Sequence, residues 1–187
     1  MKQSIWLFLL LTFANTANAQ RNVILLIADD LGTDYLGFYE DHQDTAPMPN
    51  IRKLLAKGVR FTNAWSNPVC SATRAGMLTG RYSFRTGVGN VVGGTGGSGV
   101  LDINEVTIPR LLKTFNPNGI GTANIGKWHL QPAMPLSNLN NPNIMGYDLF
   151  AGNFIGAITS YTNWTKVTNG VSSTITNYAT TETVNDA

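Results

Sequence analysis

Residues 22–30 read Asn-Val-Ile-Leu-Leu-Ile-Ala-Asp-Asp, and this stretch indicates the fold class. Residues 22–28 are apolar after the first position and rich in branched side chains, a pattern typical of a strand buried on both faces of a parallel sheet. Further along the chain, strand patterns alternate with helix patterns. The sequence therefore predicts an α/β fold with a largely parallel central sheet flanked by helices.

The strand pattern ends in two adjacent acids, Asp29 and Asp30. Open α/β sheets place their ligands at the carboxyl ends of central strands, which is where these carboxylates are expected. Adjacent carboxylates repel each other unless a cation or a donor lies between them, so a hard divalent metal is one explanation. The alternative is that one carboxylate caps a helix while the other is solvated.

A second informative stretch, residues 67–81, contains the only cysteine of the chain, Cys70. Pro68 disfavours helix before it, and the residues after Cys70 suit a helix that ends at Gly80. Cys70 would then face the positive end of the helix dipole, with Arg74 one turn along on the same side. Such a site favours a tetrahedral oxyanion, whereas the alternative for Cys70 is a small buried apolar residue.

Lys127 and His129 follow a predicted strand over 120–125. Because they are two residues apart, an extended segment would project both side chains to the same side. A cation and an imidazole directed at one place suit an anionic substrate, since lysine neutralises charge and histidine holds or transfers a proton. The alternative is a surface lysine and a packed histidine.

The remaining elements are predicted from capping residues and hydrophobic periodicity. We expect helices over 49–58 and 107–118, a short strand at Val59 and Phe61, and an exposed hairpin around Asn169-Gly170. The glycine-rich segment 88–100 is expected to be a loop beside the site, His42 a surface residue, and Asp148 a residue without chemistry.

Composition excludes several classes of protein. The chain has 187 residues with 13 basic against 11 acidic side chains, so no basic block predicts a nucleic-acid partner. Residues 1–19 resemble a secretory signal peptide with a small-residue cleavage site, which leaves 20–187 as an exported domain, periplasmic or secreted. No other segment predicts a membrane anchor, and a lone cysteine excludes an internal disulfide.

The residues from Cys70 to Arg74, followed by Thr79-Gly80-Arg81, resemble the C-x-P-x-R and T-G-R signature of the type I sulfatases, with Ala72 at the proline position. Residues 126–130, Gly-Lys-Trp-His-Leu, resemble the second signature of that family. The resemblance implies the alkaline-phosphatase-like sulfatase fold, of which residues 20–187 would form the N-terminal part of the catalytic domain.

The resemblance also implies a chemistry. Cys70 would be converted to formylglycine by a formylglycine-generating enzyme, and the hydrated aldehyde would attack the sulfur of a sulfate monoester, either a small molecule or a sulfated carbohydrate. The implied roles are calcium binding (Ca²⁺) by Asp29, Asp30 and residue 70, nucleophile stabilisation by Arg74 and sulfate binding by Lys127. His129 would orient the hydrate and assist breakdown of the sulfated intermediate.

Other interpretations stay open from the sequence. A phosphate or phosphonate monoester hydrolase of the same superfamily would share the fold, and a non-catalytic truncated chain would at most bind sulfated glycans. The family's second acidic metal pair, a further histidine and a further lysine find no match in residues 20–187. We therefore expect this stretch, made alone, to be inactive and not to fold to a well-behaved monomer.

Overall fold

The computed structural model describes residues 22–39, 45–93, 99–117 and 119–187. They fall into two units that divide between Thr45 and Ala46, and each unit is described by itself. The predicted signal peptide, His42 and residues 94–98 of the glycine-rich loop lie outside the described residues. Within the described ranges, no helix has the length and apolarity needed to cross a membrane.

The first unit corrects the prediction for residues 22–28. This segment is not a strand: its residues carry no regular secondary structure and are exposed, with Val23 91% and Ile24 82% accessible. A strand needs a hydrogen-bonded neighbour, and the described residues of this unit, 22–39 and Thr45, contain no strand to provide one. Among these described residues, the one regular element is the 3₁₀ helix η1, Thr33–Tyr35.

The second unit contains a four-stranded sheet with the order β1-β2-β3-β4. The strands are Ala123–Ile125 (β1), Leu149–Gly152 (β2), Trp164–Thr168 (β3) and Val171–Ile175 (β4). β1 and β2 are parallel, whereas β2 with β3 and β3 with β4 are antiparallel. The α/β class is confirmed, but the described sheet is mixed rather than largely parallel, because the chain returns after β2 and then forms a hairpin.

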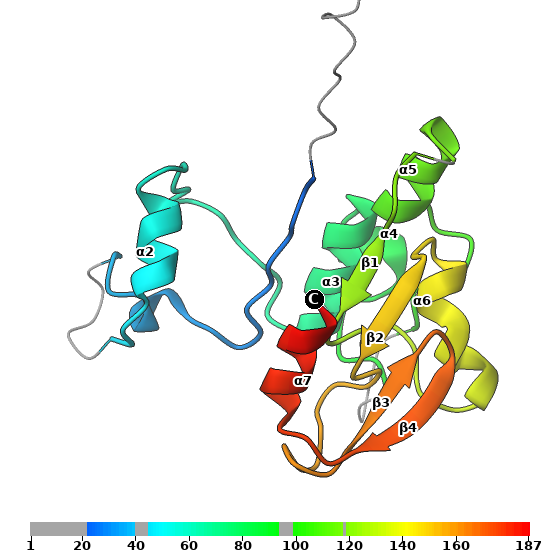
Figure 1. Cartoon of the computed structure of the whole chain (residues 1–187). Helices are drawn as coiled ribbons and strands as arrows, with labels where there is room; N and C mark the ends of the chain where they lie inside the picture. The colour runs from blue at the N-terminus through cyan, green and yellow to red at the C-terminus, as the bar shows by residue number, and fades with distance from the viewer. Residues whose placement is uncertain (1–21, 40–44, 94–98, 118) are drawn as a thin grey trace, which may run out of the picture. The chain divides into compact units, whose positions relative to one another are not determined.

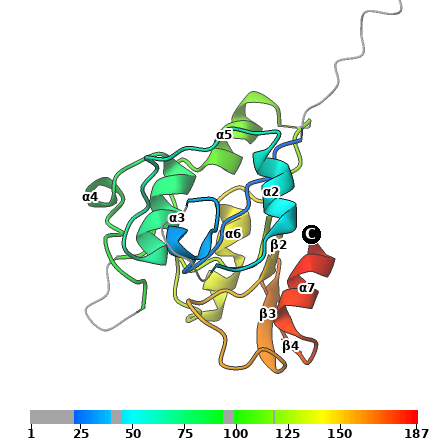
Figure 2. The same cartoon turned by 90° about the vertical axis from the view of Figure 1, so that its left-hand side faces the viewer.

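Helices lie on both faces of this sheet. In Figure 2, where β3 is seen nearly edge-on, α7 lies on one side and α3, α4 and α6 on the other, as Figure 1 also shows. Their bounds are Cys70–Thr79 (α3), Ser83–Thr86 (α4), Asn141–Ile144 (α6) and Ala179–Asp186 (α7), and the 3₁₀ helix η2, Leu136–Asn140, precedes α6.

The other two helices of this unit match the predicted positions with shorter spans. They are Pro49–Leu55 (α2) and Ile108–Phe115 (α5). Thr107 caps α5 as expected, since its side chain accepts a hydrogen bond from the Arg110 N–H. The predicted strand at Val59 and Phe61 is wrong, because both residues are exposed and lie outside the sheet.

The hairpin prediction is confirmed for its turn and corrected for its exposure. Asn169 and Gly170 both have positive φ, 45° and 84°, as a two-residue primed turn requires, and they join β3 to β4. Trp164 and Val167 on β3 are nevertheless buried, whereas β4 is mostly exposed. β3 is covered because it pairs with both β2 and β4 and packs into the core.

The core of the second unit lies around Trp128, which is 1% exposed. Its ring meets Tyr147 and Phe150 edge-on, at centroid distances of 6.2 and 6.3 Å, and its indole N–H donates to Asn141 Oδ1 at 3.1 Å. Aromatic pairs in this geometry add stability beyond the area they bury. This packing fixes the backbone on either side of Trp128, which is the segment that contains the candidate site residues.

Candidate active site

Cys70 is the first residue of α3 and is half-buried. The preceding residue, Val69, is extended, and the helix runs until Gly80, whose left-handed conformation (φ 67°) ends it. Gly80 N–H donates to the Gly76 carbonyl at 2.8 Å. The predicted helix is therefore confirmed at both ends, and it places the thiol at the end of α3 where backbone N–H groups are unpaired.

Beyond β1 the chain continues to pair with the segment after β2. Gly126 N–H donates to the Ala151 carbonyl at 2.8 Å and Trp128 N–H to the Asn153 carbonyl at 2.9 Å. At His129 the backbone turns, with φ 57°, while its N–H donates to Phe154 at 3.0 Å. The backbone is thus extended only as far as Trp128. Because His129 is not extended, the spacing of two residues does not by itself direct the Lys127 and His129 side chains to the same side.

The structure brings His129 and Cys70 together. Nδ1 of the buried imidazole lies 3.2 Å from Sγ of Cys70, across 59 residues of sequence. The proton of this contact belongs to the thiol or to Nδ1, according to the tautomer. An oxygen in place of the sulfur would lie within hydrogen-bonding reach of the same nitrogen, so the ring is placed to hold or accept a proton from residue 70.

Ser71 is a site residue that the sequence reasoning missed. Its fully buried hydroxyl donates to the His129 carbonyl at 2.9 Å and accepts from the Val92 N–H at 3.2 Å. It therefore ties three segments together: α3, the His129 segment and Val92 of the glycine-rich segment 88–100. A serine next to Cys70 also suits a helix start, so the sequence alone contained no signal of this role.

Arg74 reaches the site through the backbone of Lys127. Its guanidinium Nη1 donates to the Lys127 carbonyl at 2.6 Å, and the arginine side chain is only 8% exposed. The guanidinium therefore places a positive charge in this part of the site. The Lys127 residue is half-buried beside it.

Asp29 and Asp30 lie in a turn of the first unit and are described with it alone. Asp30 has a positive φ of 55°, which aspartate tolerates better than most residues. The described residues contain no group of three or more His, Cys, Asp or Glu side chains that could hold a metal. Two carboxylates provide too few of the six to eight oxygens that calcium takes, so they do not by themselves make a complete calcium site.

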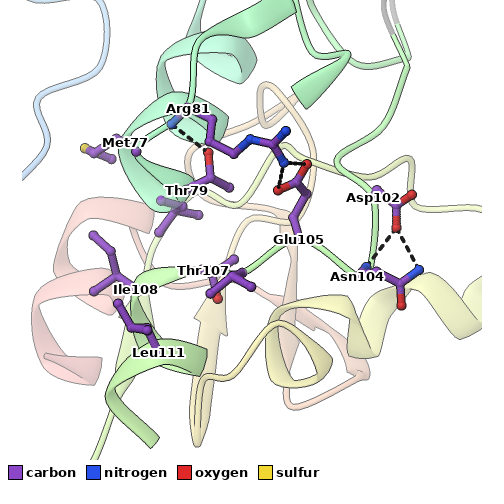
Figure 3. Close-up of a pocket in the computed structure, with 12 residues that line it drawn as sticks. Met77, Thr79, Arg81, Asp102, Asn104, Glu105, Thr107, Ile108 and Leu111 are labelled. Carbon is purple, nitrogen blue, oxygen red and sulfur yellow. Dashed lines mark hydrogen bonds and ion pairs between the residues drawn. The ribbon is translucent and has the colours of Figure 1, made fainter. Parts of the chain in front are cut away.

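Arg81, the last residue of the T-G-R run, has a structural contact of its own. Its Nη1 donates to both carboxylate oxygens of Glu105, at 2.5 and 2.6 Å. Figure 3 shows this pair at the edge of a hollow of about 620 Å³, also lined by Met77, Ile108 and Leu111. The hollow lies at the C-terminal end of α3, about 14 Å along the helix axis from Cys70, and is separate from the site.

Asp148 connects α5 to the chain before β1. Its carboxylate pairs with Lys113 and accepts from the Thr122 N–H at 2.9 Å and the Thr122 hydroxyl at 3.1 Å. The hydrogen bond from Lys113 and those from Thr122 lower the pKa of Asp148 below its usual value. These contacts explain the place of Asp148 in the fold, where it joins α5 to the chain before β1.

The profile of the Sulfatase family matches residues 21–186 of this chain. Human arylsulfatase D is 40% identical over 146 residues, which cover 73% of this chain and 24% of that protein. Human steryl-sulfatase is 39% identical over 130 residues, 66% of this chain and 21% of that protein. The chain therefore spans about a quarter of the length of these curated relatives.

Solved structures show the same likeness. Ps i-CgsB superimposes with a TM-score of 0.60 and 34% identity, covering 75% of this chain and 29% of that one. BT4656, solved in complex with its substrate D-glucosamine-2-N,6-O-disulfate, gives a TM-score of 0.64 at 24% identity and covers 86% of this chain and 29% of that one. At that identity the second likeness shows the fold, which is the alkaline-phosphatase-like sulfatase fold.

Proposed function

Because this chain belongs to the sulfatase family, we propose that it is part of an enzyme that hydrolyses sulfate monoesters, with residue 70 as the nucleophile. The observation that carries the proposal is the 3.2 Å contact between Cys70 Sγ and His129 Nδ1 at the start of α3. A nucleophile beside an imidazole, with the positive end of a helix behind it, is suited to attack on an anionic ester.

The proposal includes conversion of Cys70 to formylglycine by a formylglycine-generating enzyme. The Cβ carbon loses two electrons to an acceptor on that enzyme and becomes a thioaldehyde; water then replaces the sulfur, which leaves as hydrogen sulfide. The hydrated aldehyde supplies an oxygen nucleophile in place of a thiol. That oxygen would occupy the position of Sγ, within reach of His129 Nδ1.

Position 72, where the signature has proline, is Ala72 in this chain. It lies in the first turn of α3, before Thr73, whose N–H is the first to donate to a carbonyl at the helix start, that of Val69. A proline at position 72 would therefore remove no intrahelical hydrogen bond. We expect Ala72→Pro to raise conversion of Cys70 in a foreign host, as peptide mass spectrometry would measure.

The other site residues act on charge and protons. His129 would hold the nucleophile through Nδ1 and take its proton during attack. Arg74 and Lys127 would supply positive charge to the reacting group, and fixed cations lower the barrier of a reaction in which negative charge accumulates. Asp29 and Asp30 would provide two calcium ligands, with water or further residues completing the shell; the ion would polarise a sulfate oxygen.

We further propose that the substrate is a sulfated carbohydrate or a small sulfate ester reached outside the cytoplasm, with residues 1–19 as the export signal. The disulfated glucosamine bound to BT4656 and the arylsulfatase relatives support these two substrate classes. We also propose that residues 20–187, made alone, lack turnover. Catalytic residues act as a unit, so the rate falls far more than in proportion when some of them are missing.

The test is turnover by the protein made from its full gene together with a formylglycine-generating enzyme, beside residues 20–187 made alone. Cys70→Ala and Lys127→Ala should each lower kcat/KM for an aryl sulfate by at least about a hundredfold. Lys57→Ala, a change of the same type at an exposed position of the second unit, should leave turnover unchanged.

The alternative functions give different results. An aryl phosphate turned over faster than the sulfate would favour the phosphate monoester hydrolase. Retained sulfatase activity in Cys70→Ala would contradict the proposed nucleophile. A full gene that ends at Ala187, with a product that binds sulfated glycans without turnover, would favour the non-catalytic chain.

A further inference from the structure

The imidazole of His129 lies directly against the backbone of Gly156. A Cβ atom built on Gly156 would lie 2.6 Å from Cε1, 2.8 Å from Nε2 and 3.2 Å from Nδ1 of the His129 ring. Separations under 3.0 Å are not compatible with van der Waals contact, so any side chain at position 156 would displace the ring or the loop that follows β2. Only glycine allows both to occupy their present positions.

The backbone of His129 is fixed separately from its ring. Its N–H donates to Phe154 at 3.0 Å and its carbonyl accepts from Ser71 Oγ at 2.9 Å, while the left-handed φ of 57° sets the direction of the side chain. These contacts place the Cα–Cβ bond, but they leave rotation about the side-chain bonds open. One surface close to the far edge of the ring, Cε1 and Nε2, is the backbone of residue 156.

We propose that Gly156 is a positioning residue for the nucleophile: its lack of a side chain lets the loop pack against the His129 ring and hold Nδ1 toward residue 70. The inference rests on the proposed function for its catalytic consequence, whereas its geometric part concerns the Cys70–His129 contact alone. Position 156 thereby controls the 3.2 Å distance between Nδ1 and Sγ through the imidazole.

The backbone of Gly156 makes the test specific. Its φ lies outside the left-handed region, so an alanine there meets no conformational penalty and acts through the contact alone. Gly121 and Gly89 are matched controls, because they too lack left-handed φ and a Cβ on either meets no atom within 4 Å. All three changes add the same methyl group.

The first experiment uses the thiol form of the protein, which needs no sulfatase activity. Alkylation by iodoacetamide is followed by mass spectrometry of the tryptic peptide 61–74, so that its rate reports on Cys70 alone, and its dependence on pH reports on the neighbouring imidazole. We expect Gly156→Ala to shift this profile and the NMR titration of the His129 ring, while Gly121→Ala and Gly89→Ala match the wild type. His42→Gln assigns the signal of the second histidine.

The second experiment measures sulfate ester turnover by the modified protein. We expect Gly156→Ala to lower kcat about tenfold to a hundredfold with little change in KM, since small misplacements of a catalytic group have effects of this size. Shifted thiol and NMR profiles without any sulfatase activity in the wild type would contradict the proposed function while supporting the role of Gly156. Profiles equal to those of Gly121→Ala would overturn that role.

A double substitution covers the case in which Gly156→Ala destabilises the fold. If the added methyl group acts by contact with the imidazole, Gly156→Ala should lower the melting temperature of the wild type but not that of the His129→Ala variant, in which the ring is absent. The same loss in both backgrounds would show that residue 156 acts independently of His129 and would overturn the inference.

Discussion

Two segments of this chain are both predicted as strands from the sequence, and they differ in structure. Residues 22–28 are an apolar run, whereas 120–125 also contain glycine, threonine and asparagine; each leads into polar candidate site residues, Asp29-Asp30 in one case and Lys127 with His129 in the other. The second segment contains β1, paired with β2, and continues into Trp128, which is 1% exposed. The first has no regular structure, and its Leu26 is 75% exposed.

The difference shows that apolar composition does not by itself make a strand. The segment after residue 120 has a hydrogen-bonded neighbour within its own unit and aromatic side chains, from Tyr147 and Phe150, that cover it. Residues 22–28 have neither among the described residues of the first unit. If this contrast holds, substitutions should lower the free energy of unfolding most in the packed segment and least in residues 22–28.

The largest effect is expected from Trp128→Ala. Removing a fully buried indole leaves a cavity and leaves Asn141 without its donor, so the free energy of unfolding should fall by about 3–5 kcal/mol. Leu26→Ala, in the exposed segment, should change it by less than about 0.5 kcal/mol. Urea unfolding followed by circular dichroism measures both, and equal losses would contradict the contrast between the two segments.

A smaller loss is expected from Ser71→Ala. This change leaves the Val92 N–H and the His129 carbonyl without their shared partner in a fully buried position, at a cost of about 1–3 kcal/mol. Ser172→Ala, on the exposed strand β4, is the matched control and should be nearly neutral. If both variants unfold at the same urea concentration, Ser71 does not hold the His129 segment.

The pH dependence of stability should report on the ion pairs between β3 and α7. Lys166 Nζ lies 2.8 Å from Glu182 and 2.6 Å from Asp186. Burial disfavours the charged amine, but the hydrogen bonds that Lys166 donates to Asp186 and Glu182 outweigh it and raise the pKa of Lys166. The hydrogen bonds from Lys166 and Asn177 lower the pKa of Glu182.

These shifts have opposite signs. The stabilisation from Glu182 is fully present above its ordinary pKa of 4.5 and is lost as the pH falls through its lowered folded value. The stabilisation from Lys166 is fully present below its ordinary pKa of 10.5 and is lost as the pH rises through its raised folded value. Lys166→Met should flatten the stability curve at both extremes. The acid slope from Asp148 should persist, because Lys113 lowers its pKa independently.

The smallest change in stability is expected from Leu26→Lys. A charge in the exposed apolar segment should leave the free energy of unfolding within about 0.5 kcal/mol of the wild type and should reduce aggregation, which light scattering measures. Val167→Lys, which places the same charge on the buried face of β3, should prevent folding. If Leu26→Lys destabilised the protein as much as Val167→Lys does, the segment 22–28 would be buried in solution.

Features that depend on neighbours in sequence could be predicted. The start of α3 at Cys70 and its end at Gly80, the Thr107 cap of α5 and the Asn169-Gly170 turn each follow from a local conformational preference. The family resemblance named Cys70 and His129 together, and the structure places their side chains in contact.

Features that depend on tertiary contacts could not be predicted. The antiparallel addition of β3 and β4 depends on which strand the chain meets after β2. The roles of Ser71 and Gly156 depend on His129, which lies 58 and 27 positions away. His129 also leaves the extended conformation that the spacing from Lys127 had suggested. No local preference encodes such contacts.

The most direct test of the account is the mass of the peptide that contains residue 70. Trypsin cuts after Arg60 and Arg74, so Cys70 is released in the peptide 61–74. From protein made in its native host, the account predicts that this peptide has the mass of an aldehyde in place of the thiol and reacts with hydrazides. A peptide that carries only the unmodified thiol, in protein that turns over sulfate esters, would contradict the proposed nucleophile.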